Sequence, residues 1–250
     1  MSRFKKPLIF SLALLPITVV SIIFVCLYQF ETFPPEILEE AVAQVGSIGI
    51  VWAITIVQNV GLIMFCCFFG YILAGKLGLL KPLRLEKRAL AVKMISSLIG
   101  GIIISLDPWT FGRVIEGVKD STAAGMTLYG VIASILYGGI VEELLMRLFF
   151  MSLIAFLIFK IFCKGRDEVP EKVLVIANIV AALLFAAGHL PATFTAFGEL
   201  TPMILVRCFL LNGAFGLLFG RLYRKYGLQY AMLSHATLHI VSKIIWFIFI

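Results

Sequence analysis

Long apolar stretches separated by short polar connections run along the whole chain. Several of them exceed the ~20 residues that an α-helix needs to cross the hydrocarbon core of a bilayer. A membrane β-barrel would instead show short segments of alternating polarity. The pattern therefore predicts an all-α fold, a polytopic transmembrane helix bundle with about seven spans. We place these spans at residues 7–29, 47–74, 90–106, 126–159, 173–190, 202–222 and 228–249.

The composition agrees with a chain that is embedded in lipid. Hydrophobic residues make up 61% of the sequence and charged residues only 14%, whereas a soluble domain is about one quarter charged. We expect residues 1–250 to form a single integral membrane domain that crosses the lipid bilayer several times, in the cell membrane if the source is prokaryotic. The formal net charge of +7 does not indicate a nucleic-acid partner, because the basic residues cluster at the ends of the apolar runs.

The distribution of these basic residues predicts the orientation of the bundle. Most Lys and Arg residues lie in the N-terminal tail and in the connections that follow the second, fourth and sixth spans. The opposite connections contain only Arg113 and Lys119. Cytoplasmic connections carry the excess of Lys and Arg in membrane proteins. We therefore expect the N-terminus in the cytoplasm and the C-terminus outside.

The fourth span, at residues 126–159, is longer than one straight crossing requires. It contains Gly138 and Gly139 next to each other. A pair of glycines inside a helix is a candidate for a kink. The span is therefore expected to tilt, to bend or to extend beyond the membrane.

Ionisable side chains inside the spans are the clearest signal of chemistry. Such residues are costly in a bilayer and usually face a cavity or a partner. Of the acidic residues, only two fall well inside a predicted span, whereas all three histidines do. The residues singled out by this criterion are Glu142, Glu143, Arg147, His189, Arg207, His235 and His239. We expect Glu142 and the three histidines to share one cavity.

Helical spacing predicts that the two glutamates face in different directions. Glu143 and Arg147 are four residues apart, so they lie on one helix face and can form an ion pair. Glu142 is rotated by ~100° from Glu143, which leaves its carboxylate free to face the cavity. The Glu143–Arg147 pair also has a purely structural interpretation, and Arg207 is expected to be structural or to contact a lipid headgroup.

The histidines allow two interpretations. His235 and His239 are four residues apart, which is the spacing by which one helix offers two imidazoles to a metal. Together with His189 they are candidate ligands for Zn²⁺, or they donate hydrogen bonds directly, as intramembrane histidines also do between helices. The predicted boundaries place His189 near the outer end of the fifth span but His235 in the inner half of the seventh. The two rings then meet only if the fifth span starts deeper or residues 191–201 fold back.

Three short motifs carry a resemblance to a known family. Residues 142–147 read Glu-Glu-Leu-Leu-Met-Arg, an EExxxR motif, and Phe185 precedes His189 by four residues, an FxxxH motif. His235 is followed four residues later by His239, where the family has Asn or Asp. In this order the motifs resemble the CAAX protease and bacteriocin-processing (CPBP, or Abi) family of intramembrane proteases. The resemblance covers roughly residues 126–245, which would carry the catalytic core.

The resemblance implies an endopeptidase that cleaves a membrane-associated or lipidated peptide or a prenylated protein. It implies that Glu142 acts as the general base on a water molecule, with His189 beside it. His235 and His239 would bind a metal or stabilise the oxyanion. A different class of protein remains open, because the same cluster would serve a proton- or metal-coupled transporter. A catalytically silent membrane scaffold or immunity protein is the third possibility.

Overall fold

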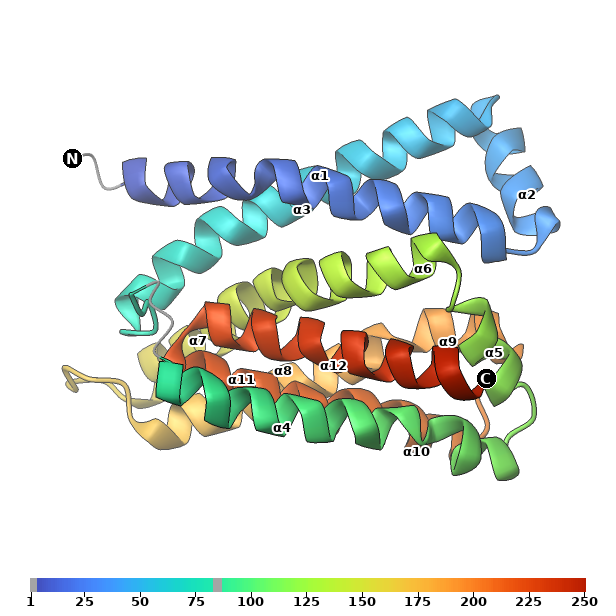
Figure 1. Ribbon diagram of the computed structural model, residues 1–250. Coiled ribbons are helices and arrows are strands. Elements are labelled where there is room, and N and C mark those ends of the chain that lie inside the picture. The colour runs from blue at the N-terminus through green and yellow to red at the C-terminus, as the bar shows by residue number, and fades with distance from the viewer. Residues whose placement is uncertain (1–3, 83–86) are drawn as a thin grey trace.

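The computed structural model describes residues 4–82 and 87–250, and this part of the chain contains helices and no strand. Seven helical segments within it are long and apolar enough to cross a membrane. They are Lys5–Thr32, Ile48–Lys76, Met94–Arg113, Leu128–Phe162, Glu171–Phe197, Pro202–Tyr226 and Leu228–Phe249. The predicted all-α fold with seven spans is therefore confirmed. The two termini lie at opposite ends of the bundle (Figure 1), as an odd number of crossings requires.

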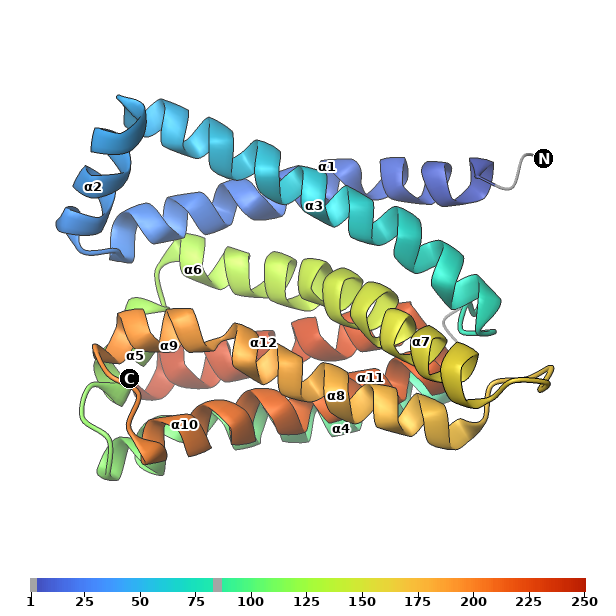
Figure 2. The same ribbon diagram turned by 180° about the vertical axis from the view of Figure 1, so that it is seen from behind.

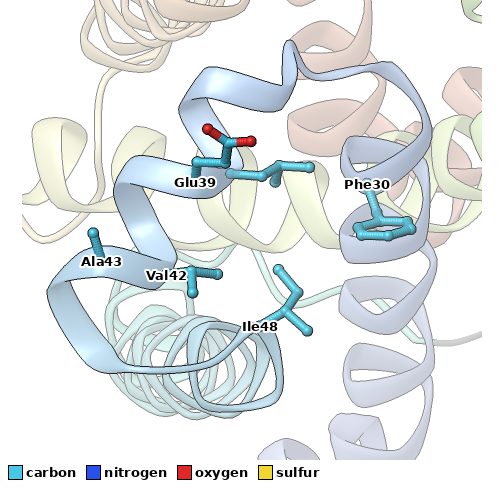
Figure 3. A pocket seen from close by; sticks show the side chains of 6 residues that line it. Phe30, Glu39, Val42, Ala43 and Ile48 are labelled. Carbon is cyan, nitrogen blue, oxygen red and sulfur yellow. The ribbon is translucent and has the colours of Figure 1, made fainter.

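A helical hairpin forms one side of the molecule (Figure 1). Its arms are α1 (Lys5–Thr32) and α3 (Ile48–Lys76), which pack against each other. The short helix α2 (Pro35–Val45) joins them at the tip. A shallow apolar hollow lies at this tip (Figure 3), lined by Phe30, Leu38, Glu39, Val42, Ala43 and Ile48.

The fourth span lies between this hairpin and the rest of the bundle (Figures 1 and 2). It starts as α6 (Leu128–Ala133), passes through two π-helical segments, η3 (Ser134–Glu142) and η4 (Leu144–Met151), and ends as α7 (Ser152–Phe162). The chain stays helical through Gly138 and Gly139, which lie in the π-helical segment η3. Whether the span kinks at the glycines stays a prediction. Turns of π-helix are rare and often mark functional sites. Glu142 is the last residue of η3, and Glu143 lies between η3 and η4.

The remaining spans form a second group of helices below the fourth span in Figure 1. This group contains α4 (Lys87–Ser105), α8 (Glu171–Gly188), α10 (Pro202–Cys208), the π-helical η5 (Phe209–Gly213), α11 (Ala214–Tyr226) and α12 (Leu228–Phe249). Helix α12 packs against α4, α11 and η3. Short segments lie at the end of the bundle near the C-terminus: η1 (Asp107–Trp109), η2 (Phe111–Arg113), α5 (Val118–Ala124) and α9 (Leu190–Phe197).

The outside of the bundle is apolar, as a lipid-facing surface must be. Large hydrophobic side chains such as Val57, Leu128 and Phe162 are exposed. A soluble protein rarely exposes apolar surface so widely. With seven candidate spans, this surface identifies an integral multi-pass membrane protein.

Close contact between α12 and η3 depends on the two adjacent glycines. A Cβ atom on Gly139 would lie 2.7 Å from the Cβ of Ala236, and one on Gly138 would lie 2.8 Å from Nε2 of His239. Small residues let helix backbones approach closely in membranes, where packing drives association. The glycines therefore bring the histidine-bearing face of α12 directly against the segment that carries the glutamates.

The first prediction tests this close contact. We expect Gly139→Ala to destabilise the protein by about 1–3 kcal/mol, because the added methyl group forces α12 away from η3. The matched control is Gly61→Ala on α3, where nothing lies within 4 Å of an added Cβ, so stability should stay the same or rise slightly. Thermal unfolding in detergent compares the two variants. Equal unfolding temperatures would contradict the contact between η3 and α12.

Candidate active site

A fully buried ion pair lies at the centre of the site. Nε of Arg147 donates to Oε2 of Glu143 at 3.1 Å, and neither side chain is exposed. The guanidinium carbon lies 5.1 Å from the ring centre of Phe185 and 6.0 Å from that of Phe219. Aromatic faces attract such a cation. The pair expected from the i, i+4 spacing is therefore present, and two aromatic rings enclose it.

His235 is attached to the same carboxylate. Its Nδ1 lies 3.0 Å from Oε1 of Glu143, and because a carboxylate only accepts hydrogen bonds, Nδ1 carries the proton. The ring stacks on Phe219 with 4.3 Å between the ring centres. Glu143 thus uses one oxygen for Arg147 and the other for His235. Its role is to fix the orientation of the imidazole.

The two histidines of α12 are in direct contact. Nε2 of His235 lies 3.1 Å from Nε2 of His239. Because neutral His235 carries its proton on Nδ1, Nε2–H of His239 donates to Nε2 of His235. The rings are nearly parallel, with centres 4.9 Å apart. A chain of contacts therefore runs from the buried guanidinium through Glu143 and His235 to His239.

Glu142 faces the more open side of the cluster, with its side chain 19% exposed. Its Oε1 lies 3.9 Å from Nε2 of His189, and its Oε2 lies 3.9 Å from Nε2 of His235. These distances are too long for direct hydrogen bonds, and a water molecule beside the two atoms can bridge them. The structure thus brings Glu142 together with the histidines, as the sequence predicted.

The tautomer of His189 is set by its own helix. Nδ1 lies 2.8 Å from the carbonyl oxygen of Phe185, and a carbonyl only accepts, so Nδ1 carries the proton. If the ring is neutral, Nε2 then presents a lone pair to Glu142. Two acceptor atoms therefore face each other across a gap, and a water molecule with two O–H groups satisfies both.

The position of His189 along its span differs from the sequence-based boundary. The span was expected to end at residue 190, which placed the ring near the outer surface. Instead α9 continues the run to Phe197 (Figure 2), and His189 lies at the junction of α8 and α9, inside the span. This depth allows the ring to meet the residues of η3 and α12 without a fold-back of residues 191–201.

The residues proposed as metal ligands do not form a recognisable metal site in this arrangement. Within residues 4–82 and 87–250, no three His, Cys, Asp or Glu side chains are grouped so as to hold a metal ion. The facing Nε2 atoms of His235 and His239 are engaged with each other. Zinc binding by His189, His235 and His239 stays a prediction, and no step below depends on it.

Three further residues were missed or misjudged from the sequence. Asp107 was not placed inside a span, but it is buried and forms a bidentate ion pair with Arg207, with Nη2 and Oδ2 2.5 Å apart. Arg207 thus has the structural role that was expected for it. Lys243 on α12 also lies inside a span. Phe219, which stacks on His235, gave no signal in the sequence beyond being aromatic.

The comparison with protein families agrees with the motifs. Residues 124–241 match the model of the Rce1-like family, described as type II CAAX prenyl endopeptidase Rce1-like. The match covers nearly the same residues as the predicted catalytic core and confirms the resemblance to the CPBP proteases. It supports a CAAX-type intramembrane endopeptidase in general. Neither the curated proteins nor the solved structures gave a match.

The second prediction concerns the buried ion pair. We expect Glu143→Gln to destabilise the protein by about 3–5 kcal/mol, because it leaves the guanidinium of Arg147 buried without a counter-charge. The matched control is Glu171→Gln. Glu171 also pairs with an arginine, Arg224, but its side chain is 65% exposed, so the loss should be about 0–1 kcal/mol. Unfolding monitored in detergent distinguishes the two, and similar losses would contradict a central role for Glu143.

Proposed function

We propose that the protein hydrolyses a peptide bond in a membrane-associated, prenylated substrate, with Glu142 activating the attacking water. The observation that carries the proposal is the gap between Oε1 of Glu142 and Nε2 of His189, where two acceptors face each other at 3.9 Å. A water molecule that donates to both atoms turns its lone pair outward, toward a substrate carbonyl. General bases of this kind must lie within reach of the water, directly or through one hydrogen bond.

The chemistry follows from this placement. The water oxygen bonds to the carbonyl carbon while Glu142 takes its proton. The resulting oxyanion needs donors, which preorganised N–H groups provide at low cost in a site that excludes bulk water. We assign this task to Nε2–H of His239, which would exchange its contact with Nε2 of His235 for the oxyanion when the substrate is bound. When the C–N bond breaks, Glu142 returns its proton to the leaving amine, so the carboxylate is restored for the next turnover.

Glu143 and Arg147 have a positioning role in this scheme. They are fully buried and do not reach the open side of the cluster. Their effect on turnover passes through His235, whose Nδ1 they hold. Hydrogen bonds of this kind fix which nitrogen carries the proton and how the ring is oriented.

A transporter or a silent scaffold is less well supported than a protease. The family match concerns an endopeptidase, and the cluster combines a base with nearby donors, which hydrolysis requires. A proton relay would use the same residues, but it would not cleave a peptide. Peptide cleavage by purified protein therefore separates a protease from the other two alternatives.

The third prediction compares the two glutamates. We expect Glu142→Gln to reduce turnover of a prenylated peptide by at least ~100-fold while the unfolding temperature is kept, because an amide cannot accept the proton from water. Glu143→Gln should instead lose activity together with stability. The measurements are peptide cleavage followed by mass spectrometry and thermal unfolding of the same samples. Full activity in both variants would exclude a catalytic role for the pair.

The fourth prediction concerns position 239. As a donor, neutral His239 is replaceable by Asn, because both offer an N–H group. We expect His239→Asn to keep much of the activity, and chelators to have little effect. Elemental analysis of purified protein, with chelation and activity measured in parallel, checks this. Stoichiometric zinc that is lost from His239→Asn, or removed by chelation together with activity, would show that His239 is a metal ligand instead.

A further inference from the structure

Lys243 continues the line of functional side chains on α12 and has no role in the hydrolytic scheme. It follows His235 and His239 at intervals of four residues, so all three lie on one face of the helix. Its Nζ donates to the carbonyl oxygen of Gly125 at 2.6 Å, in the connection between α5 and α6. The ammonium also lies 5.3 Å from the ring centre of Trp246.

Among the residues that the structure describes, no carboxylate balances the charge of Lys243. Arg147 and Arg207 each pair with a carboxylate, but across the described residues no carboxylate lies within ion-pair distance of Nζ of Lys243. An ammonium group has three donors, and the Gly125 carbonyl uses one of them. A cation inside a membrane is costly and usually marks a pathway for a substrate or an ion. An anion that arrives with the substrate would supply the missing counter-charge.

We propose that Lys243 binds the free C-terminal carboxylate of the substrate. This inference rests on the proposed function. In a CAAX-type sequence the prenylated cysteine is the fourth residue from the C-terminus. Cleavage after that cysteine leaves three residues between the scissile bond and the terminal carboxylate. In an extended chain these residues span roughly 10 Å.

The spacing along α12 matches this length. Lys243 lies eight residues beyond His235, which corresponds to about 12 Å along the helix axis, and four beyond His239, about 6 Å. The long side chain of a lysine covers the remaining difference. A peptide whose scissile carbonyl lies at the histidines therefore brings its terminal carboxylate to the ammonium group.

A carboxylate site at Lys243 would determine which peptide bond of the substrate is cleaved. A carboxylate that leaves water needs a counter-charge, and a charge-assisted hydrogen bond in a low-dielectric site is strong. A substrate with a neutral C-terminus, or with more residues after the cysteine, cannot make this bond. Lys243 would thus act as a specificity residue that favours cleavage of the peptide bond three residues before the C-terminus.

The test uses two prenylated peptides of one sequence, ending in a free carboxylate or in a carboxamide. We expect the wild-type protein to cleave the carboxylate peptide with a kcat/KM about tenfold higher or more. Lys243→Met should remove this preference by slowing cleavage of the carboxylate peptide, whereas Lys243→Arg should keep it. The matched control is Lys160→Met at the end of α7, another span lysine, which should leave the preference unchanged.

The outcomes distinguish the proposed carboxylate site at Lys243 from the proposed protease activity. If the wild type cleaves both peptides equally well, or if Lys243→Met keeps the wild-type ratio, the carboxylate site is wrong while the protease remains. If the wild type cleaves neither peptide, the proposed function itself fails. The ratio of cleavage of the two peptides by the wild-type protein needs no variant, so it still tests the carboxylate site if Lys243→Met does not fold. Lys243→Gln then serves as the second variant.

Discussion

The carboxylate of Glu143 is the contact on which the rest of the site depends. It lies in the buried centre of the bundle, accepts a hydrogen bond from Arg147 with one oxygen, and accepts one from His235 with the other. A charge at this depth is stable only with such partners. The pair therefore fixes η4 and η3 on one side and α12 on the other, and it holds the imidazole in one orientation.

The same contact explains why two adjacent glutamates have different roles. Because the side chain of Glu143 points into the interior, the helical turn directs Glu142 toward the open side of the cluster. There its oxygens lie 3.9 Å from the rings of His189 and His235. The aromatic rings of Phe185 and Phe219 enclose the charged centre. A sealed, paired carboxylate next to a partly exposed one fits the proposed role of Glu142 as general base.

Much of the fold and part of the site could be predicted from the sequence. The spans follow from hydropathy, because the bilayer demands long apolar helices, and the Glu143–Arg147 pair follows from helical spacing. The depth of His189 did not follow, because the predicted span ends at residue 190, directly before Pro191. Proline is tolerated in the first turn of a helix, and here it lies in the first turn of α9, so the span continues.

Tertiary contacts account for the other differences. Asp107 comes just after an apolar run, and only the distant Arg207 shows that it is buried in an ion pair. Phe219 resembles any lipid-facing aromatic residue until α12 places His235 against it. Lys243 lies inside the predicted seventh span, so its position follows from the sequence, but its contact with the carbonyl oxygen of Gly125 does not. In each case the partner lies far away in the chain, and local pattern carries no information about it.

Cleavage of a prenylated CAAX-type peptide by purified protein, in water enriched in oxygen-18, tests the central claim most directly. If Glu142 activates a water molecule between itself and His189, mass spectrometry should show release of the C-terminal tripeptide. The new carboxylate on the prenylated cysteine should then carry one oxygen-18 atom. Folded protein that leaves the peptide intact, or that releases a different fragment, would contradict a CAAX-type hydrolytic site formed by these residues.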